Sequence, residues 1–122
     1  MASSSQLIGQ RNSYQSYLIL VSALASLQLD NYNKLFNAYL NIKNMYKVND
    51  EFADDGKFSS CLKIVKDSYD NLNNNLIPTI KGKIDELSRD IDIALAREEE
   101  ERRQREEEEE ARRKEEEEKN NK

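Results

Sequence analysis

The chain is 122 residues long, which fits a single domain, and 35% of its residues are charged, with a net charge of −5. It contains no histidine, one cysteine, no glycine-rich phosphate loop and no paired acids in an apolar setting. We therefore expect no enzyme activity, no cofactor and no metal site. No basic stripe runs through the sequence, which argues against a nucleic-acid partner.

The net charge comes from one segment near the C-terminal end. Residues 97–119 hold 13 acidic and eight basic residues, so the rest of the chain, with 11 acidic and 11 basic residues, is neutral. The low mean hydropathy of −0.94 therefore owes much to this segment. About 95 residues remain to build a core, which is small.

The first predicted element is one long helix over residues 6–47, preceded by a short stretch, residues 1–5, that we expect to be frayed. Apolar residues recur on one side of this helix at steps of three, four or seven, the spacing of an amphipathic helix. They are Leu7, Tyr14, Leu18, Val21, Ala25, Tyr32, Leu35, Tyr39, Ile42 and Tyr46, with Arg11 and Gln28 interrupting. A second apolar strip beside them consists of Leu20, Leu24, Leu27, Phe36 and Leu40. A helix with so wide an apolar face usually contacts more than one neighbour.

Part of this helix also resembles a secretory signal sequence. The apolar run from Tyr17 to Ala25 ends in small residues, like the hydrophobic region and cleavage site of such a signal. Against this interpretation, the preceding region carries a single positive charge, Arg11, and the helical spacing continues through Ser26. The run is also too short to span a membrane, which takes about 20 apolar residues. The lysines that follow are too scattered to form a basic membrane-binding face.

Residues 48–57 are the one clear break between helices. They include Asn49, Asp50, Asp54, Asp55 and Gly56, which are residue types that favour turns and caps. The next helix is expected to be capped by Ser59 or Ser60, or by one of the two preceding aspartates if it starts earlier. Because so short a connection joins two long helices, we predict an all-α fold, an antiparallel helical hairpin.

The second predicted helix covers residues 58–96 and carries the most regular apolar stripe of the chain. The stripe advances by three or four residues at every step and consists of Phe58, Leu62, Val65, Tyr69, Leu72, Leu76, Ile80, Ile84, Leu87, Ile91 and Leu95. The residues between are mostly Lys, Asp, Asn and Ser, so the opposite face is solvated. Cys61, the only cysteine, cannot form an intrachain disulfide, and we expect it to be buried or half-buried.

This second helix contains an unfavourable region from Asn73 to Gly82. Three consecutive asparagines are followed by Pro78, which removes one hydrogen bond and costs about 3 kcal/mol inside a helix. The apolar stripe nevertheless crosses the region in step, by three successive intervals of four residues, which indicates a local change in winding. We predict a continuous helix with a kink near Pro78; the alternative is a clean break over residues 73–77.

From Arg97 the apolar stripe stops, and blocks of Glu alternate with blocks of Arg and Lys. Glu lies four residues before a basic residue in seven pairs, which favours ion pairs on one helix: Glu98 with Arg102, Glu99 with Arg103, Glu101 with Arg105, Glu108 with Arg112, Glu109 with Arg113, Glu110 with Lys114 and Glu115 with Lys119. No apolar seam supports a coiled coil here. We predict that residues 97–122 form a charged, solvated single helix or a fraying tail.

A hairpin of two long helices cannot cover all of this apolar surface. Burial of a Leu or Phe side chain is worth about 1.5 to 3 kcal/mol, so five exposed ones would forfeit on the order of 10 kcal/mol. We therefore expect a helical bundle formed with a second hairpin, of the same or a related chain. The predicted partner interface consists of Leu20, Leu24, Leu27, Phe36 and Leu40 on the first helix and Leu72, Leu76 and Ile80 on the second.

This organisation resembles the small helical-hairpin proteins of the WXG superfamily of Gram-positive type VII secretion, in particular the accessory partners of LXG-type toxins. The resemblance covers about residues 6–96 and rests on two long helices, the turn with Gly56 and the run from Ile80 to Ile91. The chain has no tryptophan, and Asp54-Asp55-Gly56 stands where the family has Trp-x-Gly. The resemblance implies that this chain is itself the partner protein: it would bind the N-terminal helices of such a toxin, or a related small helical protein, and present the bound protein for export.

The same resemblance implies a cytoplasmic protein, or one exported without a cleaved signal peptide. Such systems use a Tyr-x-x-x-Asp/Glu export signal after the second helix, whereas the match here, Tyr46 to Asp50, precedes the turn and is expected by chance. A second hypothesis is a homodimeric, coiled-coil-like structural spacer in which the charged helix acts as a stiff rod.

Overall fold

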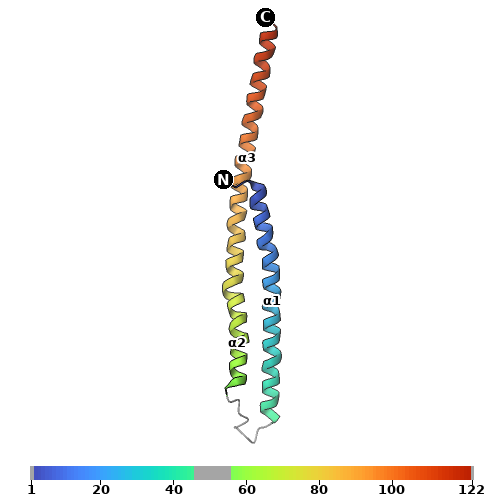
Figure 1. The fold of residues 1–122 in the computed structure, drawn as a ribbon, viewed down its shortest axis with the longest axis vertical. Helices are drawn as coiled ribbons and strands as arrows, with labels where there is room; N and C mark the ends of the chain where they lie inside the picture. The colour runs from blue at the N-terminus through green and yellow to red at the C-terminus, as the bar shows by residue number, and fades with distance from the viewer. Residues whose placement is uncertain (1, 46–55, 122) are drawn as a thin grey trace. The chain divides into compact units, whose positions relative to one another are not determined.

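The computed structural model of this chain describes residues 2–45 and 56–121. All regular structure in these two ranges is helical, which confirms the all-α prediction (Figure 1). The elements are α1 (Ser4–Met45), α2 (Lys57–Asn71), the π-helical segment η1 (Leu72–Leu76) and α3 (Ile77–Asn120). Most of the predicted turn over residues 48–57, the predicted end of the first helix and the Tyr46 to Asp50 motif lie outside the described residues.

Helix α1 begins at Ser4, inside the stretch expected to be frayed. Ser3 and Gln6 exchange hydrogen bonds: the Gln6 N–H donates to the Ser3 hydroxyl at 3.2 Å, and the Ser3 N–H donates to the Gln6 side-chain oxygen at 3.1 Å. This reciprocal pair is a capping box, which satisfies N–H groups that have no partner within the helix. The helix therefore starts two residues earlier than the apolar spacing indicated.

Helix α2 is preceded by a glycine rather than by the predicted serine or aspartate cap. Gly56 lies just before the first helical residue of α2. Its own φ is 86°, and it makes no side-chain cap bond. Glycine is favoured in this left-handed conformation because glycine has no Cβ. Ser60, one of the predicted caps, instead lies within the first turn and donates its hydroxyl to the Gly56 carbonyl at 2.5 Å.

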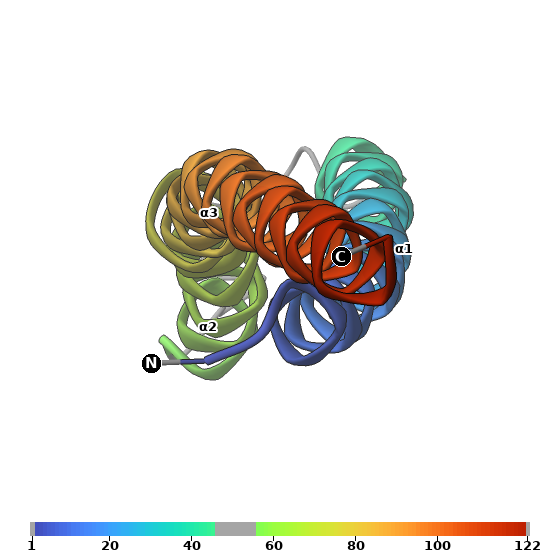
Figure 2. The same cartoon turned by 90° about the horizontal axis from the view of Figure 1, so that it is seen from above.

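The described chain stays helical from Lys57 to Asn120, so the alternative of a clean break is wrong (Figure 2). The change in winding appears as η1, where the Ile77 N–H donates to the Leu72 carbonyl, five residues back. A π-turn is wider than an α-turn, which matches the successive intervals of four residues in the stripe. Thr79 donates its hydroxyl to the Asn75 carbonyl at 2.7 Å, next to the proline that offers no N–H.

The chain divides into two compact units, one of which comprises residues 13–84. Its core is apolar and contains Val21, Ala25, Leu62 and Ile80, each no more than 9% exposed. The rings of Tyr39 on α1 and Phe58 on α2 stack with centroids 5.2 Å apart. The other described members of the two predicted core stripes in this unit are half-buried, except Leu35, which is 39% exposed, and Tyr46 lies outside the described residues. The spacing therefore predicted the core of this unit well.

The second unit combines the start of the chain, to Asn12, with the helical segment from Asp85 onward. Leu87, Ile91 and Ala94 are buried in it, whereas Leu95 is 47% exposed. The last step of the stripe is therefore three residues, from Ile91 to Ala94, and the prediction that Leu95 continues it is wrong. Ala94 lines a hollow of about 270 Å³ together with Ala2 and Leu7 from the start of the chain.

A polar contact between Ser4 and Glu98 lies at the end of the core of this second unit. Ser4 is only 7% exposed, and both its backbone N–H and its hydroxyl donate to the Glu98 carboxylate, at 2.9 and 2.5 Å. These two bonds, the hydroxyl bond first, hold the pKa of Glu98 below its usual value. The Arg97 guanidinium donates to the Ala2 carbonyl at 3.3 Å. Glu98 thus satisfies an N–H at the start of α1, a position that favours negative charge.

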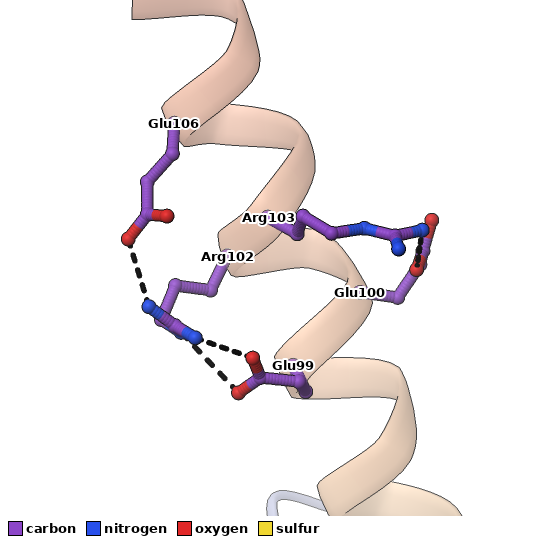
Figure 3. A network of polar contacts seen from close by, with 5 residues as sticks. All are labelled: Glu99, Glu100, Arg102, Arg103 and Glu106. Atoms are coloured by element: carbon purple, nitrogen blue, oxygen red, sulfur yellow. Dashed lines mark hydrogen bonds and ion pairs between the residues drawn. The ribbon is translucent and has the colours of Figure 1, made fainter.

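Beyond Glu98, α3 continues as an exposed helix as far as Asn120, and every residue from Glu99 to Asn121 is exposed. Figure 3 shows how charges pair along it: Arg102 contacts both Glu99 and Glu106, and Arg103 contacts Glu100. Of the seven predicted pairs, Glu110 with Lys114 is present, at 3.8 Å. Glu98 bonds Ser4 instead of Arg102, and Arg102 turns to Glu99, three residues back.

Candidate partner-binding face

The five residues of α1 predicted to contact a partner are all exposed. Leu20 and Leu27 expose 67% and 60% of their surfaces, Leu24 exposes 46%, and Phe36 and Leu40 expose 39% and 38%. Core residues one or two positions away, such as Val21 and Ala25, are 5% and 4% exposed. The helix is therefore oriented with its first apolar side inward and the second strip in solvent.

These five residues lie on two flanks of α1 rather than on one strip. Leu20, Leu24 and Leu27 are separated by steps of four and three, which keeps them on one face. The step from Leu27 to Phe36 is nine residues, or about two and a half turns, so Phe36 and Leu40 lie on the other side of the core stripe. The single strip predicted from the sequence is therefore wrong in this respect.

Each flank also carries a further exposed apolar residue close to these. Tyr17, 47% exposed, precedes Leu20 by three residues, and Leu29, 39% exposed, precedes Phe36 by seven. We call the first set the proximal strip and the second set the distal strip. The proximal strip is Tyr17, Leu20, Leu24 and Leu27, and the distal strip is Leu29, Phe36 and Leu40. The missed residues were visible in the sequence at heptad-like spacing from the others.

The predicted partner residues of the second helical segment are less accessible. Leu72 and Leu76 are half-buried, and Ile80 is 3% exposed. Ile80 belongs to the core of the unit formed by residues 13–84 and offers almost no surface to a partner. The candidate face therefore lies mainly on α1.

The proximal strip lies in a stretch of α1 without charges. No charged residue occurs from Asn12 to Leu29, between Arg11 and Asp30. A hollow of about 250 Å³ lined by Ser13, Tyr14 and Tyr17 lies at its N-terminal end. At its C-terminal end, Asp30 pairs with Lys34 at 2.9 Å. Depletion of charge around exposed aromatic and aliphatic side chains is typical of the centre of a protein–protein interface.

The distal strip has different surroundings. The ring of Phe36 stacks on Tyr32, one turn earlier, with centroids 5.9 Å apart, and the Lys43 ammonium lies 6.0 Å from the centre of the Tyr39 ring. The exposed fractions here, 38–39%, are smaller than those of the proximal strip. The two strips therefore differ in both accessibility and charge.

Cys61 is exposed, not buried or half-buried as predicted. Its neighbour Leu62 takes the core position at 9% exposed, and a residue one position earlier on a helix points about 100° away. Among the described residues, no group of three or more acidic or cysteine side chains could hold a metal ion. In those same ranges, no helix combines the length and apolar character needed to cross a membrane.

Comparisons with known proteins give no assignment. No protein-family model matches the chain, and neither a curated protein nor a solved structure shows significant similarity to it.

Proposed function

We propose that this chain is a non-enzymatic helical partner protein whose first helix pairs with helices of another chain. The observation that carries the proposal is the set of five apolar side chains of α1 that remain 38–67% exposed. Weighted by these exposed fractions, their burial would contribute about 4 to 7 kcal/mol. That amount is comparable to the stability of a small domain.

The fold that presents this face is proposed to be an antiparallel hairpin. The stacking of Tyr39, six residues before the end of α1, on Phe58, the second residue of α2, supports it. A reversal of chain direction between these two residues accounts for the contact. The proposed kink near Pro78 is supported by η1, because π-turns and prolines are both recognised causes of helix bends.

The chemistry of the partner follows from the chemistry of the face. An apolar strip on a helix is matched by an amphipathic helix with apolar residues at steps of three and four. The resemblance to accessory partners of LXG-type toxins suggests which helix this is. It is the N-terminal helical region of the toxin, which this chain would bind in the cytoplasm and present for export. This identification rests on the resemblance alone, whereas the need for a helical partner rests on the exposed residues.

The test is capture of the helical N-terminal region of an LXG-type toxin by the full chain. One variant changes the proximal strip (Leu20→Gln with Leu24→Gln), and one changes the distal strip (Phe36→Gln with Leu40→Gln). We expect at least one of them to weaken capture by about 100-fold. Ile19→Gln is the matched control, because Ile19 is 71% exposed but belongs to neither strip.

Two results would overturn the proposal. One is a folded, soluble, monomeric chain that captures no helical partner. The other is an equal loss of capture in the Ile19→Gln control, which would indicate a non-specific effect of removing any exposed apolar residue.

A structural spacer is the second candidate function. It is favoured by the exposed helix from Glu99 to Asn120, which is supported by ion pairs within its own turns (Figure 3). A helix that is polar on all sides is typical of a solvated bridge between parts of an assembly. If the chain captures no partner but its variants with fewer ion pairs lose helicity in this segment, the spacer is the better explanation.

A further inference from the structure

The proximal strip is nearly symmetric along the helix. Tyr17 and Leu27 are equally far from residue 22, and so are Leu20 and Leu24. The next residues on the same face, Ser13 and Asn31, are also equidistant from it and are both exposed and polar. A second α1 that runs antiparallel across this face would therefore oppose apolar residues to apolar ones and polar residues to polar ones.

We propose that the proximal strip is the site at which a second copy of this chain binds, with the two α1 helices antiparallel about a two-fold axis level with residue 22. Leu20 then packs on Leu24 of the second copy, and Tyr17 on Leu27 of the second copy. Two-fold pairing requires a self-complementary surface, and the order of residues along the strip supplies one. The inference rests on the proposed function only in using the same exposed helix.

Charge supports a second copy as the occupant. The strip lies in the uncharged stretch from Asn12 to Leu29, so two copies approach there without repulsion. A parallel pairing would place the two Lys34 residues at one level, and likewise the two Asp30 residues. In the antiparallel pairing, the two Lys34 residues are 24 positions apart along the helix, or about 36 Å. This separation of like charges favours the antiparallel orientation.

The area of the strip sets the expected strength. Four residues with full areas of about 200 Å² expose roughly 450 Å² per copy at the observed fractions. With Ser13, Ser16, Ala23 and Asn31 at its edges, the pair buries a total of about 1,000 Å², near the lower limit for a specific interface. A reversible dimer is therefore expected, with dissociation in the micromolar range.

The pairing leaves the distal strip free. Leu29, Phe36 and Leu40 lie on the other flank of α1, so a partner helix can contact them while the second copy occupies the proximal strip. The assembly expected from both proposals contains two copies of this chain and two partner chains.

Sedimentation equilibrium of the full chain tests self-association. At about 100 µM the mass should approach twice 14.2 kDa, and at about 1 µM it should approach 14.2 kDa. Leu20→Gln with Leu24→Gln should remain at the single-chain mass at both concentrations, with helicity unchanged by circular dichroism. Phe36→Gln with Leu40→Gln should dimerise like the unchanged chain. A chain that stays monomeric, or a dimer lost only in the distal variant, overturns the inference.

Disulfide trapping tests the orientation. In a Cys61→Ser background, chains with Leu20→Cys are mixed with chains with Leu24→Cys under mild oxidation. The mixture should give a covalent dimer of the two different chains, because the antiparallel pairing opposes these positions, whereas each chain alone should cross-link several-fold less. Efficient cross-linking of the Leu24→Cys chain with itself would instead indicate a parallel pairing and overturn the proposed orientation.

The outcomes separate this inference from the proposed function. A monomeric chain that captures a toxin helix through the proximal strip would overturn the second-copy assignment and leave the partner role intact. A dimer that captures no partner would do the reverse.

Discussion

The contrast between Ile80 and Leu20 gives the most direct test of which apolar residues the chain covers by itself. Ile80 is 3% exposed and lies in the core of residues 13–84, whereas Leu20 is 67% exposed. Truncation of a buried isoleucine to alanine costs about 2 to 3 kcal/mol where the neighbours can relax. Leu20 has only a third of its surface covered, so Leu20→Ala should cost about 0.5 to 1 kcal/mol.

Thermal unfolding followed by circular dichroism measures this difference. For a domain of about 100 residues, each kcal/mol shifts the melting temperature by about 4 to 8 °C. Ile80→Ala should therefore lower it by about 10 to 20 °C, and Leu20→Ala by about 3 to 6 °C. The chain should be held near 1 µM, where the proposed dimer is dissociated and Leu20 faces water.

Equal losses in the two variants would refute the reasoning. They would mean that Leu20 is covered within the isolated chain, so that the exposed surface on which the partner role depends does not exist. Leu87→Ala serves as a positive control, because Leu87 is 2% exposed in the other unit and should behave like Ile80.

Four further predictions follow from other parts of the chain. The hydrogen bonds from Ser4 lower the pKa of Glu98, so the stability that the Glu98 carboxylate contributes is present at neutral pH and is lost as pH falls through its folded-state pKa. The free energy of unfolding from urea melts should therefore differ less between pH 7 and pH 3 in Glu98→Gln than in the unchanged chain. Pro78→Ala should restore a helical N–H and raise the free energy of unfolding by about 1 to 3 kcal/mol in a urea melt; a lower value would mean that the π-turn at Leu72–Leu76 needs the proline. Salt near 1 M should speed amide exchange in residues 102–118, where the ion pairs are exposed, and leave the exchange of residues 85–94 unchanged. Truncation after Glu101 removes nine acidic and eight basic residues and leaves a net charge of −4, so the melting temperature and the solubility of the chain, measured as the highest concentration free of light-scattering aggregates, should both stay close to those of the unchanged chain.

The helices and most of the core could be predicted because both depend on local spacing. The stripe from Phe58 to Ile91 is buried or half-buried throughout, and its successive steps of four matched a wider turn at η1. Periodicity reports which face of a helix avoids water, and that is decided within a few turns. The apolar side of the first helix is inward for the same reason.

Contacts between distant parts of the chain could not be predicted in this way. Glu98 has Arg102 four residues ahead, yet its carboxylate bonds Ser4, 94 residues away. No spacing rule on one helix can reveal such a partner. The Ser3 to Gln6 capping box, in contrast, was readable as Ser-x-x-Gln, and the nine-residue step from Leu27 to Phe36 already separated the two strips.

The distribution of charge connects the exposed strips to the C-terminal helix. The whole net charge of −5 lies in residues 97–119, and the stretch from Asn12 to Leu29 has none. An exposed apolar face promotes aggregation unless the chain carries net charge elsewhere. The residues beyond Glu98 are exposed and pair with one another. The charged helix therefore supplies electrostatic repulsion between chains without contributing residues to the core or to the strips. Because charged residues on the strip itself would weaken binding, this separation leaves α1 an uncharged surface for the proposed association, while the charge of residues 97–119 opposes aggregation.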